Sequence, residues 1–282
     1  MSDMTASFPS QKRFVRSRRI LAAAVFALVA GAAVGPARAD SPWKGSCAAP
    51  RDLLVSTATL PHLARKLALG GSVKIVAFGS SSTAGTGAST VAATYPSRFA
   101  AELQRLFPQT RVSILNKGVP GEDVRDEMLR FERDVLEQHP DLLIWQTGTN
   151  SALHQDPFHT YVGKLTRGID EAHAAGIDVL LMSPQFSPRF EAVANHKDYL
   201  EHLETVAALR GVPLLRRYEI MKFWVGSGEM TEKDMVQRDG LHQTDASYYC
   251  LGVVTARMVA GLANRPAFLA GVTAVADRTT GK

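Results

Sequence analysis

An aspartate and a histidine stand three residues apart near the end of the chain, in the segment Asp239-Gly240-Leu241-His242. Side chains at this spacing lie on the same side of one turn of chain, so the carboxylate can orient the imidazole and stabilise its protonated form. A histidine held in this way acts as a general base toward a hydroxyl group. The pair therefore predicts nucleophilic catalysis, provided that the fold brings a serine to it.

Three consecutive serines, Ser80, Ser81 and Ser82, follow an apolar run in the segment VAFGSSSTAG at residues 76–85. Each of the three hydroxyls could serve as the nucleophile, so Ser80, Ser81 and Ser82 remain alternatives at this point. A serine-rich turn that caps a helix would explain the same composition. A nucleophilic serine would accept an acyl group, and this acyl transfer needs further groups. Their presence therefore decides between a nucleophile and a serine-rich structural turn.

Acyl transfer requires hydrogen-bond donors aimed at the oxyanion that forms on the carbonyl oxygen. Two later segments can supply them, NKGVPG at 116–121 and GTN at 148–150. Gly121 lacks a Cβ and can bring its main-chain N–H close to a ligand, and Asn150 can offer its side-chain amide. The main-chain N–H of the nucleophilic serine is a third candidate donor.

The elements that must position these groups alternate between short apolar runs and helical patterns. The apolar runs, rich in Val, Ile and Leu, predict strands at 73–79, 111–116, 141–148, 177–184 and 212–217. Helical patterns occur at 59–69, 97–107, 122–139, 158–176, 192–211 and 245–263. This alternation predicts a five-stranded parallel sheet with helices on both faces, a flavodoxin-like three-layer α/β/α sandwich. The carboxyl ends of parallel strands share one edge, so all the candidate groups can converge there.

Four blocks in this order resemble the SGNH hydrolase superfamily of GDSL-type esterases and lipases, over most of residues 73–262. The resemblance implies a triad of Ser81, His242 and Asp239. It also implies an oxyanion hole made by the N–H groups of Ser81 and Gly121 and by the amide of Asn150. The same resemblance supports the predicted sandwich fold and implies that no cofactor is needed.

Two positions depart from the pattern of that superfamily. Ser80 replaces the aspartate that usually precedes the nucleophile, and Ser151 stands where many members have an aspartate after the asparagine. The first change removes a carboxylate that often ties neighbouring loops together. We expect altered loop contacts rather than the loss of the nucleophile.

Further polar residues follow the third and fourth predicted strands. Gln185 and Arg189 are candidate substrate contacts, and a guanidinium could hold a carboxylate or a sugar, although a solvent-facing loop would also explain Arg189. His154, Asp156 and His159 do not have a recognised metal-ligand spacing. We therefore predict no metal site.

The first 39 residues have the organisation of an export signal: a basic segment, an apolar stretch and a small-residue cleavage site before Asp40. They hold six of the 32 basic and one of the 27 acidic residues, so the remaining chain has 26 of each and gives no indication of nucleic-acid binding. We expect a periplasmic or secreted protein without a stable membrane anchor once the leader is removed. The expected boundaries are a leader at 1–39, an N-terminal arm at 40–71, a hydrolase domain at 72–265 and a tail at 266–282.

Cys47 and Cys250 are the two cysteines of the chain. In an exported protein they could form a disulfide between the arm and the last helix, and two buried free thiols are the alternative. The sequence leaves this choice open.

The sequence as a whole predicts an exported serine esterase for small acyl esters, with O-acetyl groups on carbohydrate as the favoured substrate. Two other functions remain compatible with it. An O-acyltransferase would use the same triad with a sugar hydroxyl in place of water. A non-catalytic carbohydrate-binding relative would retain the scaffold alone.

Overall fold

A computed structural model describes residues 43–264. The predicted leader at 1–39 and the predicted tail at 266–282 lie outside the described residues. The expected domain boundaries therefore remain predictions.

Five parallel strands form one sheet in the order β2-β1-β3-β4-β5. Their bounds are β1 (Gly71–Gly79), β2 (Thr110–Gly118), β3 (Leu142–Gln146), β4 (Asp178–Met182) and β5 (Leu214–Leu215). This is the flavodoxin-like order, so the predicted sandwich fold is confirmed. Gly79 pairs in register with both Gly118 and Gln146, and Gln146 pairs with Met182. The first four strands therefore end level with one another at a single rim.

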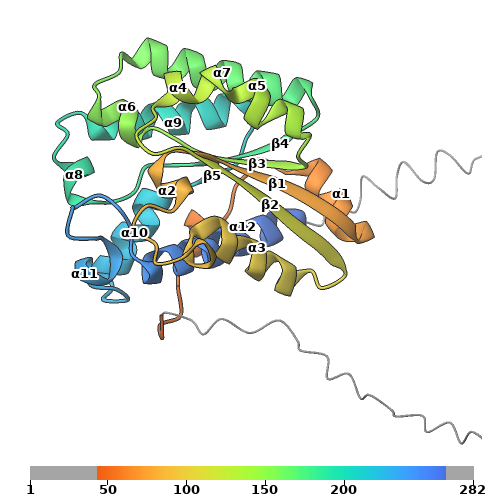
Figure 1. The fold of residues 1–282 in the computed structure, drawn as a ribbon, viewed down its shortest axis with the longest axis horizontal. Coiled ribbons are helices and arrows are strands. Elements are labelled where there is room, and N and C mark those ends of the chain that lie inside the picture. The colour runs from red at the N-terminus through yellow and green to blue at the C-terminus, as the bar shows by residue number, and fades with distance from the viewer. Residues whose placement is uncertain (1–42, 265–282) are drawn as a thin grey trace, which may run out of the picture. The chain divides into compact units, whose positions relative to one another are not determined.

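Helices cover both faces of the sheet, as Figure 1 shows. One face carries α1 (Pro61–Leu69), α3 (Tyr95–Leu106), α10 (Arg217–Gly226) and α12 (Asp245–Ala263), and the other carries α4 (Val124–Leu129), α5 (Phe131–Asp134), α7 (Phe158–Ala174) and α9 (His196–Arg210). The side chains of β3 show why both faces need cover. Leu142 and Ile144 join the first apolar core, while Leu143 and Trp145 join the second. Helix α12 is long and apolar enough to cross a membrane, but most of it is buried in the first core.

Short helices cluster where strands end or loops return to the rim. They are α2 (Ser81–Ala84), α6 (Thr149–Leu153), α8 (Pro188–Glu191) and α11 (Glu232–Met235). Single 3-10 turns, η1 (Arg51–Leu53), η2 (Val91–Ala93) and η3 (Leu136–Gln138), complete the connections. These short elements set the directions of the candidate site residues.

The helix expected at 122–139 is broken, and this part of the prediction was wrong. Helix α4 ends at Leu129 and α5 begins at Phe131. Arg130, between them, leaves helical geometry at ψ 8° and turns its side chain into the interior. Its guanidinium donates to the main-chain oxygens of Gly79 and Lys117 at 3.0 and 2.8 Å, so it fastens the ends of β1 and β2 together.

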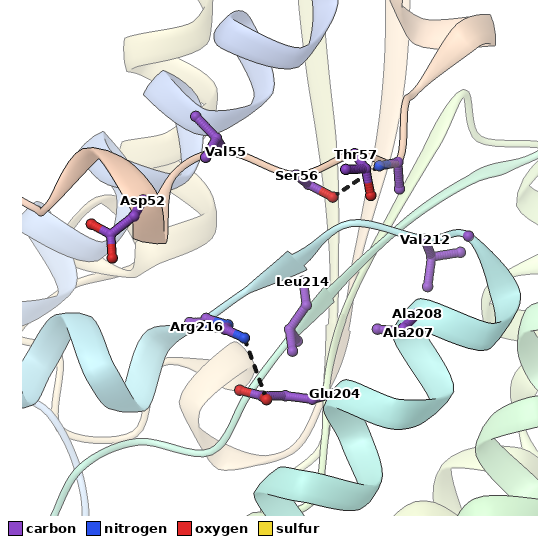
Figure 2. A pocket seen from close by; sticks show the side chains of 12 residues that line it. Asp52, Val55, Ser56, Thr57, Glu204, Ala207, Ala208, Val212, Leu214 and Arg216 are labelled. Atoms are coloured by element: carbon purple, nitrogen blue, oxygen red, sulfur yellow. Dashed lines mark hydrogen bonds and ion pairs between the residues drawn. The ribbon is translucent and has the colours of Figure 1, made fainter.

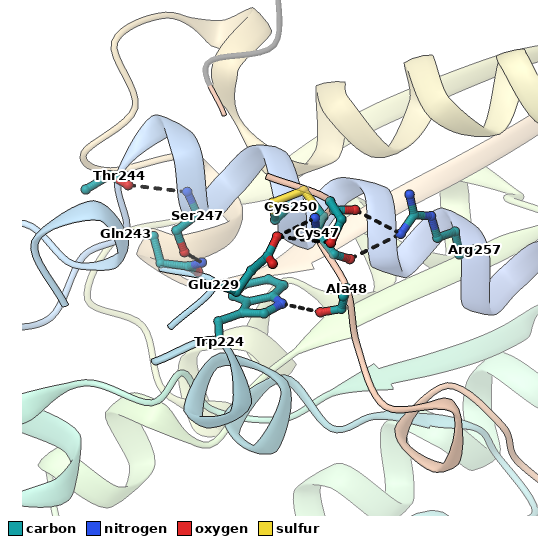
Figure 3. The surroundings of a disulfide bond; sticks show 10 residues. Cys47, Ala48, Trp224, Glu229, Gln243, Thr244, Ser247, Cys250 and Arg257 are labelled. Carbon is teal, nitrogen blue, oxygen red and sulfur yellow. Dashed lines mark hydrogen bonds between the residues drawn. A yellow bond between two sulfur atoms is a disulfide. The ribbon is translucent and has the colours of Figure 1, made fainter. Parts of the chain in front are cut away.

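Cys47 and Cys250 form a disulfide, which answers the question that the sequence left open. Figure 3 shows the bond between the N-terminal arm and α12. Neighbouring contacts hold the same part of the arm, because Trp224 Nε1 donates to the oxygen of Ala48 at 2.7 Å and Arg257 donates to the oxygen of Cys47 at 3.1 Å. The arm is therefore tied to the core both covalently and by hydrogen bonds.

Farther along, the arm passes beside β5, the edge strand of the sheet (Figure 2). Residues 52 and 55–58 of the arm, together with α9 and β5, line a cavity of about 450 Å³. An ion pair between Arg216 and Glu204 crosses one side of it, with 3.3 Å between nitrogen and oxygen. None of the candidate site residues lines this cavity.

Candidate active site

The chain turns sharply from β1 into α2 at Gly79. Gly79 has a φ of +148°, and a Cβ placed there would lie 2.4 Å from the main-chain oxygen of Gln146. Only glycine allows β1 to come so close to β3 at this point. Ser81 therefore begins α2 directly above the ends of the two central strands.

Ser81, His242 and Asp239 meet at the rim. The hydroxyl oxygen of Ser81 lies 3.0 Å from Nε2 of His242, and Nδ1 of His242 lies 2.5 Å from Oδ2 of Asp239. The other carboxylate oxygen of Asp239 accepts the main-chain N–H groups of Leu241 and His242 at 2.9 and 3.0 Å. Asp239 thus holds both the imidazole ring and the turn that carries it.

Of the three consecutive serines, Ser81 is the one whose hydroxyl contacts the imidazole. Ser80 turns inward, where its N–H and its hydroxyl donate to Oε1 of Gln146 at 3.1 and 3.3 Å. Thr83 donates to the same oxygen at 3.1 Å. Ser82 is buried beneath the turn. A neutral network on Gln146 thus joins α2 to β3.

The candidate oxyanion donors Gly121 and Asn150 follow β2 and β3, the two strands that flank β1 in the sheet. Within residues 43–264, the N–H groups of Ser81 and Gly121 have no hydrogen-bond acceptor. Gly121 has a φ of +86° and open space around the position that a Cβ would occupy. The amide of Asn150 donates one hydrogen to the oxygen of Glu122 at 2.7 Å, and its second hydrogen remains for a ligand.

Arg130 also fixes the loop that carries Gly121, a role that sequence analysis missed. Its Nε donates to the carboxylate of Glu122 at 2.6 Å, one residue after Gly121. The same guanidinium lies over the ring of Phe78, 4.2 Å from its centroid. A lone arginine inside a helical pattern gives no sequence signal of this kind, because its partners are distant in the chain.

The polar residues around His154 form ion pairs with one another. Arg125 binds the carboxylates of Asp123 and Asp156 at 2.7 Å each, and Nδ1 of His154 lies 3.1 Å from Asp123. Burial acts to raise the pKa of Asp123, but the hydrogen bonds from Arg125 and His154 outweigh it and lower the pKa to about 2. Across the described part of the chain, no group of three His, Cys, Asp or Glu side chains is placed to hold a metal ion.

The two candidate substrate contacts after β4 occupy different environments. Gln185 is 1% exposed, and its amide binds protein groups at both ends, so its side chain lies inside the protein and away from a substrate. The exposed Arg189 lies next to the turn of the triad residues, where its N–H donates to the oxygen of Gly240 at 3.0 Å. Only Arg189 keeps a side chain that a substrate could reach.

The fold is that of the SGNH hydrolases, a class of carboxylic ester hydrolases. A sequence model of the Non-GDSL lipase-like family matches residues 46–265, and the chain belongs to that family. A stretch of 53 residues is 38% identical to an acetylxylan esterase from Geobacillus stearothermophilus. That stretch covers 19% of this chain and 24% of the relative.

Solved structures of esterases share the fold. The acetylxylan esterase Axe2 from Geobacillus stearothermophilus has a TM-score of 0.57 and 20% identity, covering 67% of this chain and 95% of that one. A two-domain esterase active on acetylated mannans has a TM-score of 0.63 and 19% identity, covering 75% and 56%. A lipase/acylhydrolase from Enterococcus faecalis has a TM-score of 0.58 and 25% identity, covering 67% and 96%.

Proposed function

We propose that this protein is an exported serine esterase that removes small acyl groups, above all O-acetyl groups carried by carbohydrate. The observation that carries the proposal is the chain of contacts from the hydroxyl of Ser81 through His242 to Asp239, at 3.0 and 2.5 Å. A hydroxyl, an imidazole and a carboxylate in this order form the arrangement that activates a serine.

In the proposed reaction, the oxygen of Ser81 attacks the ester carbonyl while Nε2 of His242 takes its proton. The N–H groups of Ser81 and Gly121 and the amide of Asn150 stabilise the oxyanion. His242 then gives its proton to the alcohol oxygen, the carbon–oxygen bond breaks and the alcohol leaves. Water then attacks the carbonyl carbon of the acyl-enzyme while His242 takes a proton from it. His242 gives this proton to the oxygen of Ser81 as the bond between that oxygen and the carbonyl carbon breaks, which releases the carboxylic acid and restores the hydroxyl of Ser81.

The alcohol part of the ester must lie on the histidine side of Ser81, because His242 protonates the leaving oxygen. The lining of a groove of about 720 Å³ includes both chain neighbours of Asp239; its residues are Pro188, Glu232, Lys233, Val236, Gln237, Arg238 and Gly240. Its mixed polar and charged lining suits an alcohol with many hydroxyl groups. Arg189 lies beside this groove through its bond to Gly240 and is the proposed substrate contact. The acetylxylan and acetylmannan esterases among the similar proteins support the same substrate class.

Export is part of the proposal. The segment 1–39 would be the leader, followed by the arm at 40–71, the hydrolase domain at 72–265 and the tail at 266–282. The disulfide between Cys47 and Cys250 supports this, because disulfides persist mainly in oxidising compartments such as the periplasm or the extracellular space.

The test compares the wild type with Ser81→Ala and with the matched control Ser82→Ala. The proposal predicts that a fluorophosphonate probe labels the wild type and Ser82→Ala but not Ser81→Ala. Turnover of p-nitrophenyl acetate should follow the same pattern, falling at least about 10³-fold in Ser81→Ala. A folded wild type that neither labels nor turns over any ester would refute the proposal.

A substrate panel then tests the chemical class. It contains p-nitrophenyl esters from acetyl to palmitoyl, acetylated xylan and acetylated mannan, each with and without an added acceptor sugar. We expect kcat/KM to be highest for acetyl and to fall with chain length, with release of free acetate from the glycans. Maximal rates on long-chain esters would contradict the acetyl preference, and transfer of acetyl to the added sugar would identify an acyltransferase.

A further inference from the structure

Arg217, the first residue of α10, is completely buried and has no carboxylate partner among the described residues. Its Nε donates to the main-chain oxygen of Ser183 at 2.8 Å. One terminal nitrogen donates to Oε1 of Gln185 at 2.8 Å, and the other donates to Oε1 of Gln243 at 3.4 Å. All three acceptors are neutral, so the positive charge is held by oriented dipoles alone.

The groups that accept from Arg217 extend to the candidate site. Gln185 also accepts the hydroxyl of Thr149 at 2.9 Å and donates its amide to the oxygen of Leu241 at 3.3 Å. Gln243 donates to the hydroxyl of Ser247 at 2.6 Å, which joins it to the first turn of α12. Leu241 and Gln243 are the two chain neighbours of His242, and Thr149 is the chain neighbour of Asn150. One guanidinium is thereby connected to both chain neighbours of His242 and to the residue that precedes Asn150, a proposed oxyanion donor.

Stability alone gives a poor account of this arginine. Burying a charge is unfavourable, and buried ionic groups can often be replaced by apolar side chains of similar volume without loss of stability. Burial lowers the pKa of Arg217 to about 10, so the group still carries its charge near neutral pH. An apolar residue would lack the N–H donors of the planar guanidinium, which hold three acceptors at fixed angles to one another.

We propose that Arg217 is a positioning residue of the esterase: its buried fork fixes the turn that carries His242 and the start of the helix that carries Asn150 relative to the end of β4. The inference rests on the proposed function, because it concerns the same reaction. Arg217 itself does not touch the reacting atoms. It acts through Gln185 and Gln243, which set the distance between the imidazole and the hydroxyl of Ser81.

The chemistry of the fork distinguishes arginine from lysine at this position. A lysine would keep the charge, but its three donors radiate from one nitrogen and cannot reproduce the planar spread over Ser183, Gln185 and Gln243. Methionine would keep much of the volume and remove every donor. The neighbouring Arg216 is the matched control, because it is half-exposed, directly precedes the same helix and pairs with Glu204 instead of the network.

The experiment measures Arg217→Lys, Arg217→Met and Arg216→Met in the disulfide-bonded protein. Melting temperature and near-ultraviolet circular dichroism report folding, the final extent of fluorophosphonate labelling counts competent serines, and p-nitrophenyl acetate gives kcat and KM. We expect kcat to fall about 10-fold in Arg217→Lys and about 100-fold in Arg217→Met, as for other small misplacements of catalytic groups. KM should change less than about 3-fold, since the site that binds the ester is not removed. Labelling should slow in proportion to kcat/KM yet reach the same final extent, and Arg216→Met should match the wild type.

Several results would overturn the inference. Wild-type kcat in folded Arg217→Met would show that the fork positions nothing, and wild-type kcat in Arg217→Lys would show that the charge alone is sufficient. A loss that follows the folded fraction, with normal kcat per labelled serine, would assign Arg217 a purely structural role. An inactive wild type would instead refute the proposed function, so the two failures are distinguishable.

Discussion

At the scale of single residues, Asp239 uses its two oxygens for different tasks. One binds the imidazole of His242, and the other accepts two main-chain N–H groups of the same turn. Burial acts to raise the pKa of Asp239, but the hydrogen bond from His242 and those from the turn outweigh it and lower the pKa below its ordinary value. The contribution of the ionised form to stability is therefore present above the unfolded-state pKa, near 4, and is lost as the pH falls through the lower folded-state pKa.

The first prediction concerns Asp239→Asn. An amide in this place would favour the wrong tautomer of His242 and would not stabilise the imidazolium, so kcat for p-nitrophenyl acetate should fall about 10³- to 10⁴-fold. Steady-state kinetics at pH 7 to 8 measure this. Asp170→Asn, on an exposed aspartate of α7 that pairs with Arg210, is the control and should leave kcat unchanged. A loss smaller than about 10-fold in Asp239→Asn would speak against the proposed role of Asp239.

At the scale of elements, the interrupted segment from α4 to η3 carries three buried ionisable side chains that the sequence pattern concealed, Glu127, Arg130 and Asp134. Arg130 separates α4 from α5 and points into the rim. Glu127, on α4, is fully buried against β3, where its Oε2 accepts Nε1 of Trp145 at 2.8 Å. Burial raises the pKa of Glu127 to about 8. The folded protein thus keeps this carboxyl protonated under conditions in which the unfolded chain ionises it.

A second prediction follows from the sign of this shift. Because the folded state binds the proton more tightly, Glu127 favours folding below the unfolded-state pKa, near 4.5, and this contribution is lost as the pH rises toward 8. Over that window the free energy of unfolding should fall by as much as about 5 kcal/mol. Glu127→Gln removes the ionisation and should therefore gain stability relative to the wild type as the pH rises.

Thermal unfolding between pH 5 and pH 9 measures this difference. The melting temperature of Glu127→Gln minus that of the wild type should increase from pH 5 to about pH 8 and level off above it. Glu132→Gln, on an exposed glutamate of the neighbouring α5, should show a constant difference. A constant difference for Glu127→Gln as well would show that the carboxyl does not titrate in this window.

At the scale of the whole described molecule, the N-terminal arm joins parts of the chain that are far apart in sequence. The disulfide spans 203 residues, from Cys47 to Cys250, and the arm then continues beside the edge strand β5. A covalent link across so long a segment restricts the unfolded chain strongly. Cys250 stands in the second turn of α12, the helix that follows His242.

The third prediction is that the double variant Cys47→Ser, Cys250→Ser loses about 2–5 kcal/mol in free energy of unfolding. Denaturant titration of the oxidised wild type and the variant measures this. The kcat of the variant at 25 °C should stay within about twofold of the wild type, because the contacts of Ser81, Asp239 and His242 do not involve the disulfide. Equal stability of the two proteins, or a loss of kcat without a loss of stability, would contradict this account of the bond.

The sequence by itself determined the order of strands and helices and the local relation of Asp239 to His242. Apolar runs of strand length and helical periodicity are properties of neighbouring residues, and a three-residue spacing fixes the geometry within a single turn. Tertiary structure alone decided that Ser81 and not Ser80 or Ser82 contacts the imidazole, that the side chain of Gln185 turns inward, and that the cysteines pair. The tertiary structure alone also shows which groups Arg130 and Arg217 bind, because their partners lie on other loops. Composition and periodicity do not encode such contacts. The contacts depend on how closely the ends of different strands approach one another once helices cover both faces of the sheet.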